Sequence, residues 1–186
     1  MADIINCTPD RGALRQNFEG LYGGTFEAIC EGIDNSIDYR PPCTPENPGT
    51  VDIIFVKRGK ELVQVVLSDD GYAIGTLEEW AKFLMIKRQM QSNGSSGAYG
   101  TGAKSMMDYL SASPIVISHK NEKLMWVNYS DAGDTYDVPV NSEGDKGTGA
   151  IKSLWKAFAV DPDKNGTIII FNELKRHFDI KDVKEN

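Results

Sequence analysis

The sequence predicts an α+β domain, because it contains both β-forming segments and segments with helical spacing. Two pairs of β-forming segments are each joined by a short polar turn, residues 50–59 with 61–71 and residues 114–120 with 123–130. Segments with helical spacing of apolar residues lie between these pairs. The apolar run 166–171 adds one more strand. Strands joined by short turns are antiparallel neighbours, and the helices between the pairs are expected to form a second layer.

Length and charge limit the possible functions. A chain of 186 residues suits one domain with a single core, and its 40% apolar and 25% charged residues are ordinary for a soluble protein. The net charge of -7 argues against general binding of nucleic-acid backbone. No apolar run approaches a membrane span and no signal core is present, so a cytoplasmic location, or a nuclear one in a eukaryote, is expected. The three widely spaced cysteines indicate neither a disulfide framework nor a zinc site.

A helix expected within residues 12–40 carries polar groups that could do chemistry. Glu31 and Asn35 lie four positions apart and share a face, as do Asp34 and Asp38. A carboxylate beside an amide oxygen suits a divalent cation and an attacking water. Taken alone, this pattern favours the other interpretation, a solvated acidic face, because such faces are common.

Further elements follow from local signals. Thr76 and Glu79 form a plausible capping box at the start of a helix over residues 76–90. The other expected elements are a helix over 104–112, one short strand within 131–150 and a helix over 151–158.

The strand 61–71 ends in two carboxylates and a glycine, "SDDG". A buried Asp69 could accept a hydrogen bond from an exocyclic amine such as that of adenine. Gly71 would let a flat ring approach the backbone closely. The alternative is a plain type I turn, since Asp and Gly both favour turns.

The stretch "GAYGTGAKS" contains Gly97, Gly100 and Gly102 just before a helix expected to start near Ala103. Backbone N–H groups at a helix N-terminus bind anions, and Lys104 adds a positive charge at the same point. The stretch is not a Walker P-loop, because Ala103 is one residue too many and no buried strand precedes the loop. The alternative, a flexible linker, explains the glycines but not Lys-Ser at a helix start.

A second motif resembles a calcium loop without matching it. Asp161, Asp163 and Asn165 have the spacing of an EF-hand, but the twelfth position is Asn172 rather than Glu. Residues 167–171 are strongly β-forming, which does not suit an exiting helix. A tight turn that leads into a core strand is therefore expected.

The order of these motifs resembles the GHKL ATPase superfamily, and most closely the microrchidia (MORC) ATPases. The matching segments are "EGIDNSID", "SDDGYAIGTLEEW", "GAYGTGAKSMMDYLSASPIVISHKNEKLMWV" and "NGTIIIFNELKR". The resemblance covers residues 20–178, leaving an N-terminal segment 1–19, expected to become ordered on dimerisation, and a charged tail 179–186. It implies a two-layer α/β sandwich, the Bergerat ATP-binding fold, with a mixed, mainly antiparallel sheet and helices on one face of that sheet.

The resemblance also implies roles for individual residues. Glu31 would be the general base, Asn35 would hold Mg²⁺, and Asp34 would face the nucleotide, with Asp38 completing the helix motif. Asp69 would bind the adenine amine, with Gly71 leaving room for the ring. The other nucleotide-binding residues that it implies are Ala73, Ile74, Gly97, Ala98, Tyr99, Gly100, Thr101, Gly102, Ala103, Lys104 and Thr167.

Two departures from the family pattern matter for activity. Ala73 stands where the family has a second glycine, and its methyl group could crowd a hinge. Many relatives also place a lysine from a following transducer domain against the γ-phosphate. The residues after the last expected strand are too few for that domain, so we expect either a longer protein or a partner to supply the lysine. Because that charge would stabilise the transition state, slow hydrolysis is expected.

The expected function is an ATPase in which ATP and Mg²⁺ close a Gly-rich lid and promote dimerisation or partner binding. Two alternatives stay open from the sequence. One is a nucleotide-switched binding module without turnover, and the other is a small serine protein kinase like the anti-sigma factors.

Overall fold

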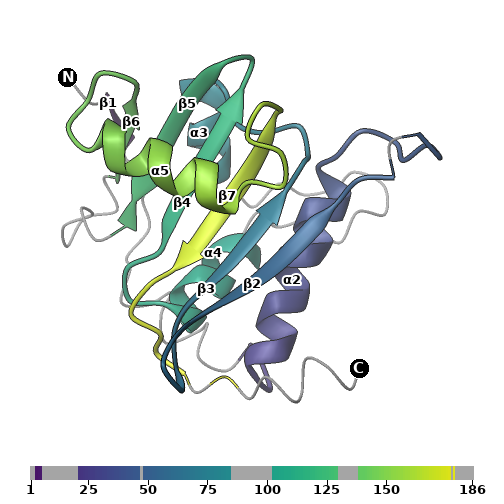
Figure 1. The fold of residues 1–186 in the computed structure, drawn as a ribbon, viewed down its shortest axis with the longest axis vertical. Helices are drawn as coiled ribbons and strands as arrows, with labels where there is room; N and C mark the ends of the chain where they lie inside the picture. The colour runs from purple at the N-terminus through teal and green to yellow at the C-terminus, as the bar shows by residue number, and fades with distance from the viewer. Residues whose placement is uncertain are drawn as a thin grey trace.

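The computed structural model describes residues 3–5, 21–46, 48–84, 102–129, 138–176 and 178. Its strands are β1 (Asp3–Ile5), β2 (Val51–Arg58), β3 (Glu61–Asp69), β4 (Ile115–Lys120), β5 (Lys123–Asn128), β6 (Val138–Ser142) and β7 (Gly166–Phe171). Its helices are α2 (Thr25–Asp38), α3 (Leu77–Leu84), α4 (Gly102–Leu110) and α5 (Thr148–Phe158). The strands form one sheet in the order β1-β6-β5-β4-β7-β3-β2, and every pairing between described strands is antiparallel (Figure 1). The α+β class and the mainly antiparallel character of the sheet are thereby confirmed, whereas the described strands include no parallel pair of the expected mixed sheet.

The hairpin between β4 and β5 shows how local sequence sets strand register. Asn121 and Glu122 form its two-residue turn, with φ of 51° and 62°. A turn with both central residues in the left-handed region matches the right-handed twist of the flanking strands. Lys120 therefore pairs with Lys123, and the predicted hairpin is confirmed.

Side chains of the central strands alternate between two hydrophobic clusters. On β3, Val65 and Leu67 belong to the cluster that contacts α2, α3 and α4, whereas Val66 belongs to the opposite one. On β7, Ile169 faces the first cluster and Ile168 faces the second. The first cluster includes Ala28, Ile29, Trp80, Met106, Met107 and Leu110 from the helices. The central strands β3 and β7 are therefore buried on both faces.

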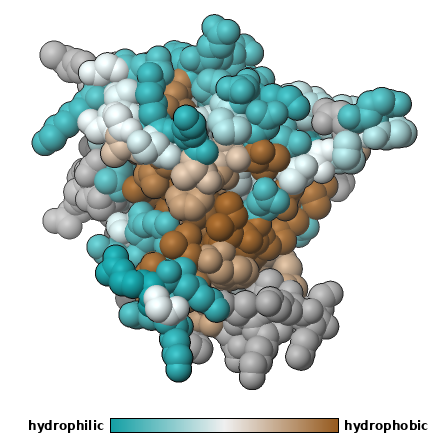
Figure 2. All heavy atoms as spheres, viewed as in Figure 1, coloured by the Kyte–Doolittle hydropathy of each residue, from teal (hydrophilic) through white to brown (hydrophobic). Residues whose placement is uncertain are grey.

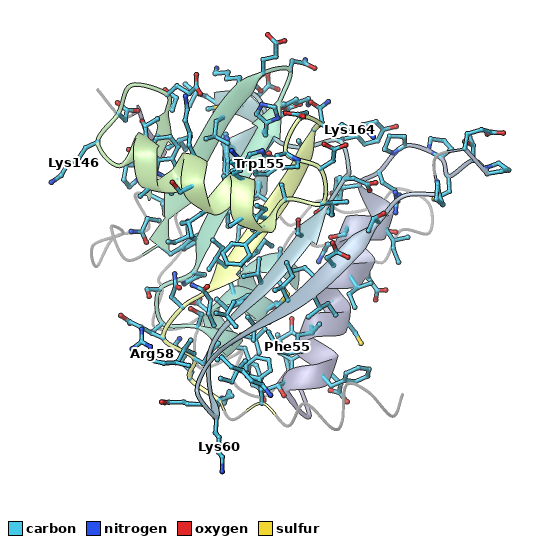
Figure 3. All side chains as sticks on the ribbon, viewed as in Figure 1. Phe55, Arg58, Lys60, Lys146, Trp155 and Lys164 are labelled. Atoms are coloured by element: carbon cyan, nitrogen blue, oxygen red, sulfur yellow. The ribbon has the colours of Figure 1, made fainter. Side chains whose placement is uncertain are left out.

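The helix α5 corrects the expectation that all helices lie on one face. It crosses the face opposite α2 and α4 (Figure 1), and its Ile151 and Trp155 belong to the second cluster. The Trp155 side chain lies between α5 and the sheet, whereas Lys146 projects away from the molecule (Figure 3). A strand buried on both faces needs a continuous apolar run, which is why residues 168–171 read "IIIF".

α5 covers only part of its face of the sheet. Figure 2 shows hydrophobic side chains gathered at the centre of this face. Hydrophobic residues that are only partly buried on this side include Ile54, Ile115, Leu154 and Phe158.

The calcium-like loop is a tight turn before β7, as predicted. Asp161 accepts a hydrogen bond from the N–H of Asp163 at 3.1 Å and pairs with Lys164 at 3.2 Å. Gly166 then starts β7, and a Cβ there would lie 2.3 Å from the carbonyl oxygen of Asp69. Within the described residues, no group of three or more His, Cys, Asp and Glu side chains is arranged to hold a metal ion.

Parts of the predicted layout lie outside the described residues. The helix expected over 76–90 is described as far as Leu84, and the loop 91–101 is not described. Within the N-terminal segment 1–19, residues 3–5 form β1, which pairs with β6 of the same chain. None of the described helices is both long and apolar enough to span a membrane.

Candidate functional site

A cavity of about 730 Å³ opens between α2, α4 and the face of the sheet that they cover. Residues from the segment before α2, from the loop after β3, from α3 and from β4 and β7 also line it. Its volume is in the range of small-molecule sites. Segments far apart in sequence thus converge on one concave surface.

One end of the cavity is acidic. Glu31 and Asn35 lie one turn apart on α2, and the Asn35 Nδ2 donates to the Glu31 carbonyl oxygen at 2.6 Å and to Glu31 Oε1 at 3.2 Å. Gly102, the first residue of α4, lies directly against this carboxylate, since a Cβ there would be 1.6 Å from Oε1. With its nitrogen turned toward Glu31, Asn35 keeps its amide oxygen as an acceptor for a cation or a water.

Two hydroxyl groups lie at the same end. The Tyr22 hydroxyl is 2.7 Å from Ser105 Oγ, and Ser105 in turn donates to the carbonyl oxygen of Gly102 at 2.9 Å. Burial raises the pKa of Tyr22, and the nearby charge of Glu31 raises it further. The first turn of α4 is thus tied to the segment that precedes α2.

The other end of the cavity centres on Asp69. Asp69, Thr167 and Ser118 lie side by side across β3, β7 and β4. The Oδ1 atom of Asp69 accepts the N–H of Gly71 at 2.9 Å, and Oδ2 accepts the hydroxyl of Ser36 at 3.1 Å. Each carboxylate oxygen keeps a second lone pair for a further donor. Burial raises the pKa of Asp69 to about 6, although both hydrogen bonds favour the ionised form.

The loop after β3 is held against the sheet by Ser118. Its buried hydroxyl accepts the N–H of Ile74 at 2.6 Å and donates to the carbonyl oxygen of Gly166 at 3.3 Å. Ala73, next to Ile74, has a φ of 59°, in the left-handed region that favours glycine. Glycine adopts this conformation more readily than alanine does.

The capping box at α3 also forms one wall of the cavity. The Glu79 N–H donates to Thr76 Oγ1 at 3.2 Å, and Glu79 Oε2 accepts the N–H of Thr76 at 3.1 Å and that of Gly75 at 2.7 Å. Lys120 of β4 completes the wall with a 2.6 Å ion pair to Glu79 Oε1. This hydrogen-bonded ion pair, more than the backbone donors, lowers the pKa of Glu79. The predicted capping box is confirmed, and it joins α3 to β4.

Most of the predicted site residues that the structure describes lie on this one cavity. They are Glu31, Asn35, Asp69, Ala73, Ile74, Gly102, Ala103 and Thr167. Gly97, Ala98, Tyr99, Gly100 and Thr101 lie outside the described residues.

Three predicted residues do not line the cavity: Asp34, Lys104 and Gly71. Asp34 is exposed, contrary to the expectation that it faces the pocket. The residues of α2 that line the cavity are Glu31, Gly32, Asn35 and Ser36, and Asp34 lies on another side of the helix. Lys104 is buried and does not line the cavity, although both of its neighbours in sequence do.

Gly71 supports the site in a different way from the one expected. It is not among the lining residues, and a Cβ there would lie 2.8 Å from the Tyr39 carbonyl oxygen and 2.9 Å from Asp69 Oδ1. The absence of a side chain therefore lets the end of β3 pack against the end of α2.

Several residues that line the cavity were not predicted as site residues from the sequence. Ser36 carries a detectable signal, since it lies four positions from Gly32 on the helix that was singled out. Tyr22 and Lys120 carry none, because only tertiary contacts bring them to the cavity. Ser105 was visible only as part of the Lys-Ser pair at a helix start.

No protein-family model matches the chain, and no curated protein sequence is significantly similar to it. The geometry of the cavity is therefore the basis for assigning a function.

The left-handed Ala73 gives a stability prediction. Ala73→Gly removes a left-handed penalty of about 1–2 kcal/mol and adds a glycine entropy cost of about 0.5–1 kcal/mol, so the free energy of unfolding should rise by up to about 1.5 kcal/mol. Gly71→Ala, two residues away, should lower it by about 1–3 kcal/mol through crowding. Urea denaturation of both variants tests this pair. A loss of stability in Ala73→Gly would rule out the strained conformation.

Proposed function

We propose that the cavity binds ATP with Mg²⁺ and that the protein hydrolyses ATP slowly to ADP and phosphate. One observation carries the proposal: the same helix contacts the buried carboxylate of Asp69 through Ser36 and presents the Glu31 carboxylate to the same cavity. Ser36, which contacts Asp69, follows Glu31 by five residues, a rise of about 7–8 Å along α2. This separation suits a ligand with a base at one end and phosphates at the other.

The base end has the chemistry to recognise an amino group. Ionised Asp69 can only accept hydrogen bonds, and an adenine amine can donate one. Thr167 lies next to Asp69 in register and supplies a hydroxyl. Ile74 and Ile169 line the cavity nearby and offer apolar contact to a ring.

The phosphate end combines a helix N-terminus with a carboxylate. The first N–H groups of α4 have no partner within the helix and attract anions. Glu31 lies beside Gly102 at this point, so a polyphosphate there would meet a negative charge. Mg²⁺ would neutralise this repulsion, with the Asn35 amide oxygen as a protein ligand and phosphate oxygens and water as the others.

Glu31 would act as the general base. Its Oε1 accepts a hydrogen bond from Asn35 Nδ2, which orients the carboxylate within the cavity. Its carboxylate would take the proton of a water that attacks the γ-phosphorus, while the bond from that phosphorus to the oxygen shared with the β-phosphate breaks and ADP leaves. Closure of the Gly-rich loop and dimerisation remain part of the proposal, and they involve residues 1–19 and 91–101, of which the structure describes only residues 3–5.

Replacing the general base should abolish turnover and spare binding. Glu31→Gln keeps the size of the side chain but cannot take a proton, so phosphate release from Mg·ATP should fall by about 10²- to 10⁴-fold. Asp34→Asn is the matched control, because it removes one carboxylate from the exposed side of the same helix, and it should release phosphate at the wild-type rate.

The same experiment separates the proposal from a binding module without turnover. If wild type binds ATP but neither it nor Glu31→Gln releases phosphate, the protein is a nucleotide-switched module. Equal release from wild type and Glu31→Gln would reject Glu31 as the base.

The raised pKa of Asp69 predicts how binding depends on pH. The ionised carboxylate accepts the hydrogen bond of the amine more strongly than the neutral acid does, and the pKa of Asp69 is about 6 in the free protein. Affinity for a non-hydrolysable ATP analogue should therefore be constant above pH 7, fall as the pH drops through 6, and be about tenfold lower at pH 5. Calorimetric titration from pH 5 to 8 measures this, and tripolyphosphate, which has no base, corrects for titration of the phosphates. Identical pH profiles for the two ligands would contradict the role of Asp69.

A further inference from the structure

Exposed hydrophobic side chains gather at the mouth of the cavity. Within the described part of the chain, five large hydrophobic side chains are exposed, and three of them line this cavity: Leu21 at 58%, Tyr39 at 66% and Tyr72 at 51%. The other two, Ile37 and Leu77, lie elsewhere. Single exposed hydrophobics are ordinary, but a group at the rim of a cavity indicates a surface that a ligand covers.

The two tyrosines belong to the Asp69 end of the cavity. The Tyr72 N–H donates to the carbonyl oxygen of Tyr39 at 3.2 Å, which joins the loop after β3 to the end of α2. Asp70 and Gly71 separate Asp69 from Tyr72, and Gly71 packs on the same carbonyl oxygen. Leu21, in contrast, precedes Tyr22, which contacts Ser105 at the acidic end.

The backbone that carries these rings is fixed on both sides. Asp69 is held by Ser36 and by the N–H of Gly71, and Ile74, two residues after Tyr72, is held by the buried hydroxyl of Ser118. Both aromatic rings are therefore presented from an anchored loop and an anchored helix end. Such presentation limits the entropy lost when a ligand covers them.

We propose that Tyr39 and Tyr72 stack on the outward face of the nucleobase, whose inner contacts are Ile74 and Ile169. This inference rests on the proposed binding of ATP. Aromatic stacking tolerates every base, so the tyrosines add affinity for a ligand that has a base, while Asp69 selects the base. The binding of the phosphates alone does not involve them.

The test compares two ligands on full-length variants. Calorimetry measures the affinity of the non-hydrolysable analogue AMP-PNP and of tripolyphosphate, each with Mg²⁺, for wild type, Tyr39→Ala and Tyr72→Ala. Each alanine variant should bind AMP-PNP at least about fivefold more weakly and tripolyphosphate with unchanged affinity. Phenylalanine at the same position should restore most of the lost affinity. Ile37→Ala and Leu77→Ala, exposed residues away from the cavity, should bind as wild type does, and melting temperatures confirm that each variant folds.

The possible failures are distinguishable. If Asp69→Asn weakens AMP-PNP binding but both tyrosine-to-alanine variants stay within twofold of wild type, the stacking inference is wrong and ATP binding stands. Equal losses for AMP-PNP and tripolyphosphate, or no recovery with phenylalanine, would also overturn it. If wild type binds no nucleotide, the proposed function and this inference are both rejected.

Discussion

The buried carboxylate of Asp69 is the constraint on which the cavity depends. It ends a core strand, accepts a hydrogen bond from Ser36 on α2, and fixes the following loop through Gly71. Its neighbour Asp70 shows what a purely structural carboxylate looks like here, since one of its oxygens pairs with Arg40 at 3.0 Å and accepts a backbone N–H. Asp69 has no such cation within hydrogen-bonding distance among the described residues, and burial raises its pKa to about 6. Keeping a buried carboxylate ionised costs free energy, and ionisable groups with such perturbed pKa values cluster at ligand-binding and catalytic sites.

The acidic end of the cavity follows from this arrangement. Because Ser36 must face Asp69, the helix α2 is fixed about its axis, and Glu31 and Asn35 are turned toward α4. Gly102 then accommodates the Glu31 carboxylate at the start of α4. The same rotation directs Asp34 to solvent, so four polar residues of one sequence motif divide between a site and a surface.

Local signals predicted much of the fold, and tertiary contacts decided the rest. The turn at Asn121 and Glu122 and the capping box at Glu79 are set by neighbouring residues, and both are confirmed. The position of α5 could not be predicted, because a continuous apolar strand shows that both faces are buried without showing what buries them. Likewise, Asp69 was visible at a strand end, but the Tyr22 contact with Ser105 depends on the packing of α2 against α4. Helical spacing identified Glu31 and Asn35 as a pair. Only the packed structure shows that this pair lines the cavity while Asp34 is exposed.

The central claim is that Asp69 accepts a hydrogen bond from the amino group of an adenine nucleotide. The most direct measurement compares the binding affinities of ATP and inosine triphosphate. The two ligands differ only at one edge of the base. Inosine triphosphate has a carbonyl oxygen where ATP has the amine, and its adjacent ring nitrogen carries a hydrogen. Calorimetric titration with Mg²⁺, at 4 °C to limit turnover, should give an affinity for ATP at least about tenfold higher, because the carbonyl leaves the buried carboxylate facing another acceptor. Equal affinities for the two ligands, or no binding of ATP, would contradict the account.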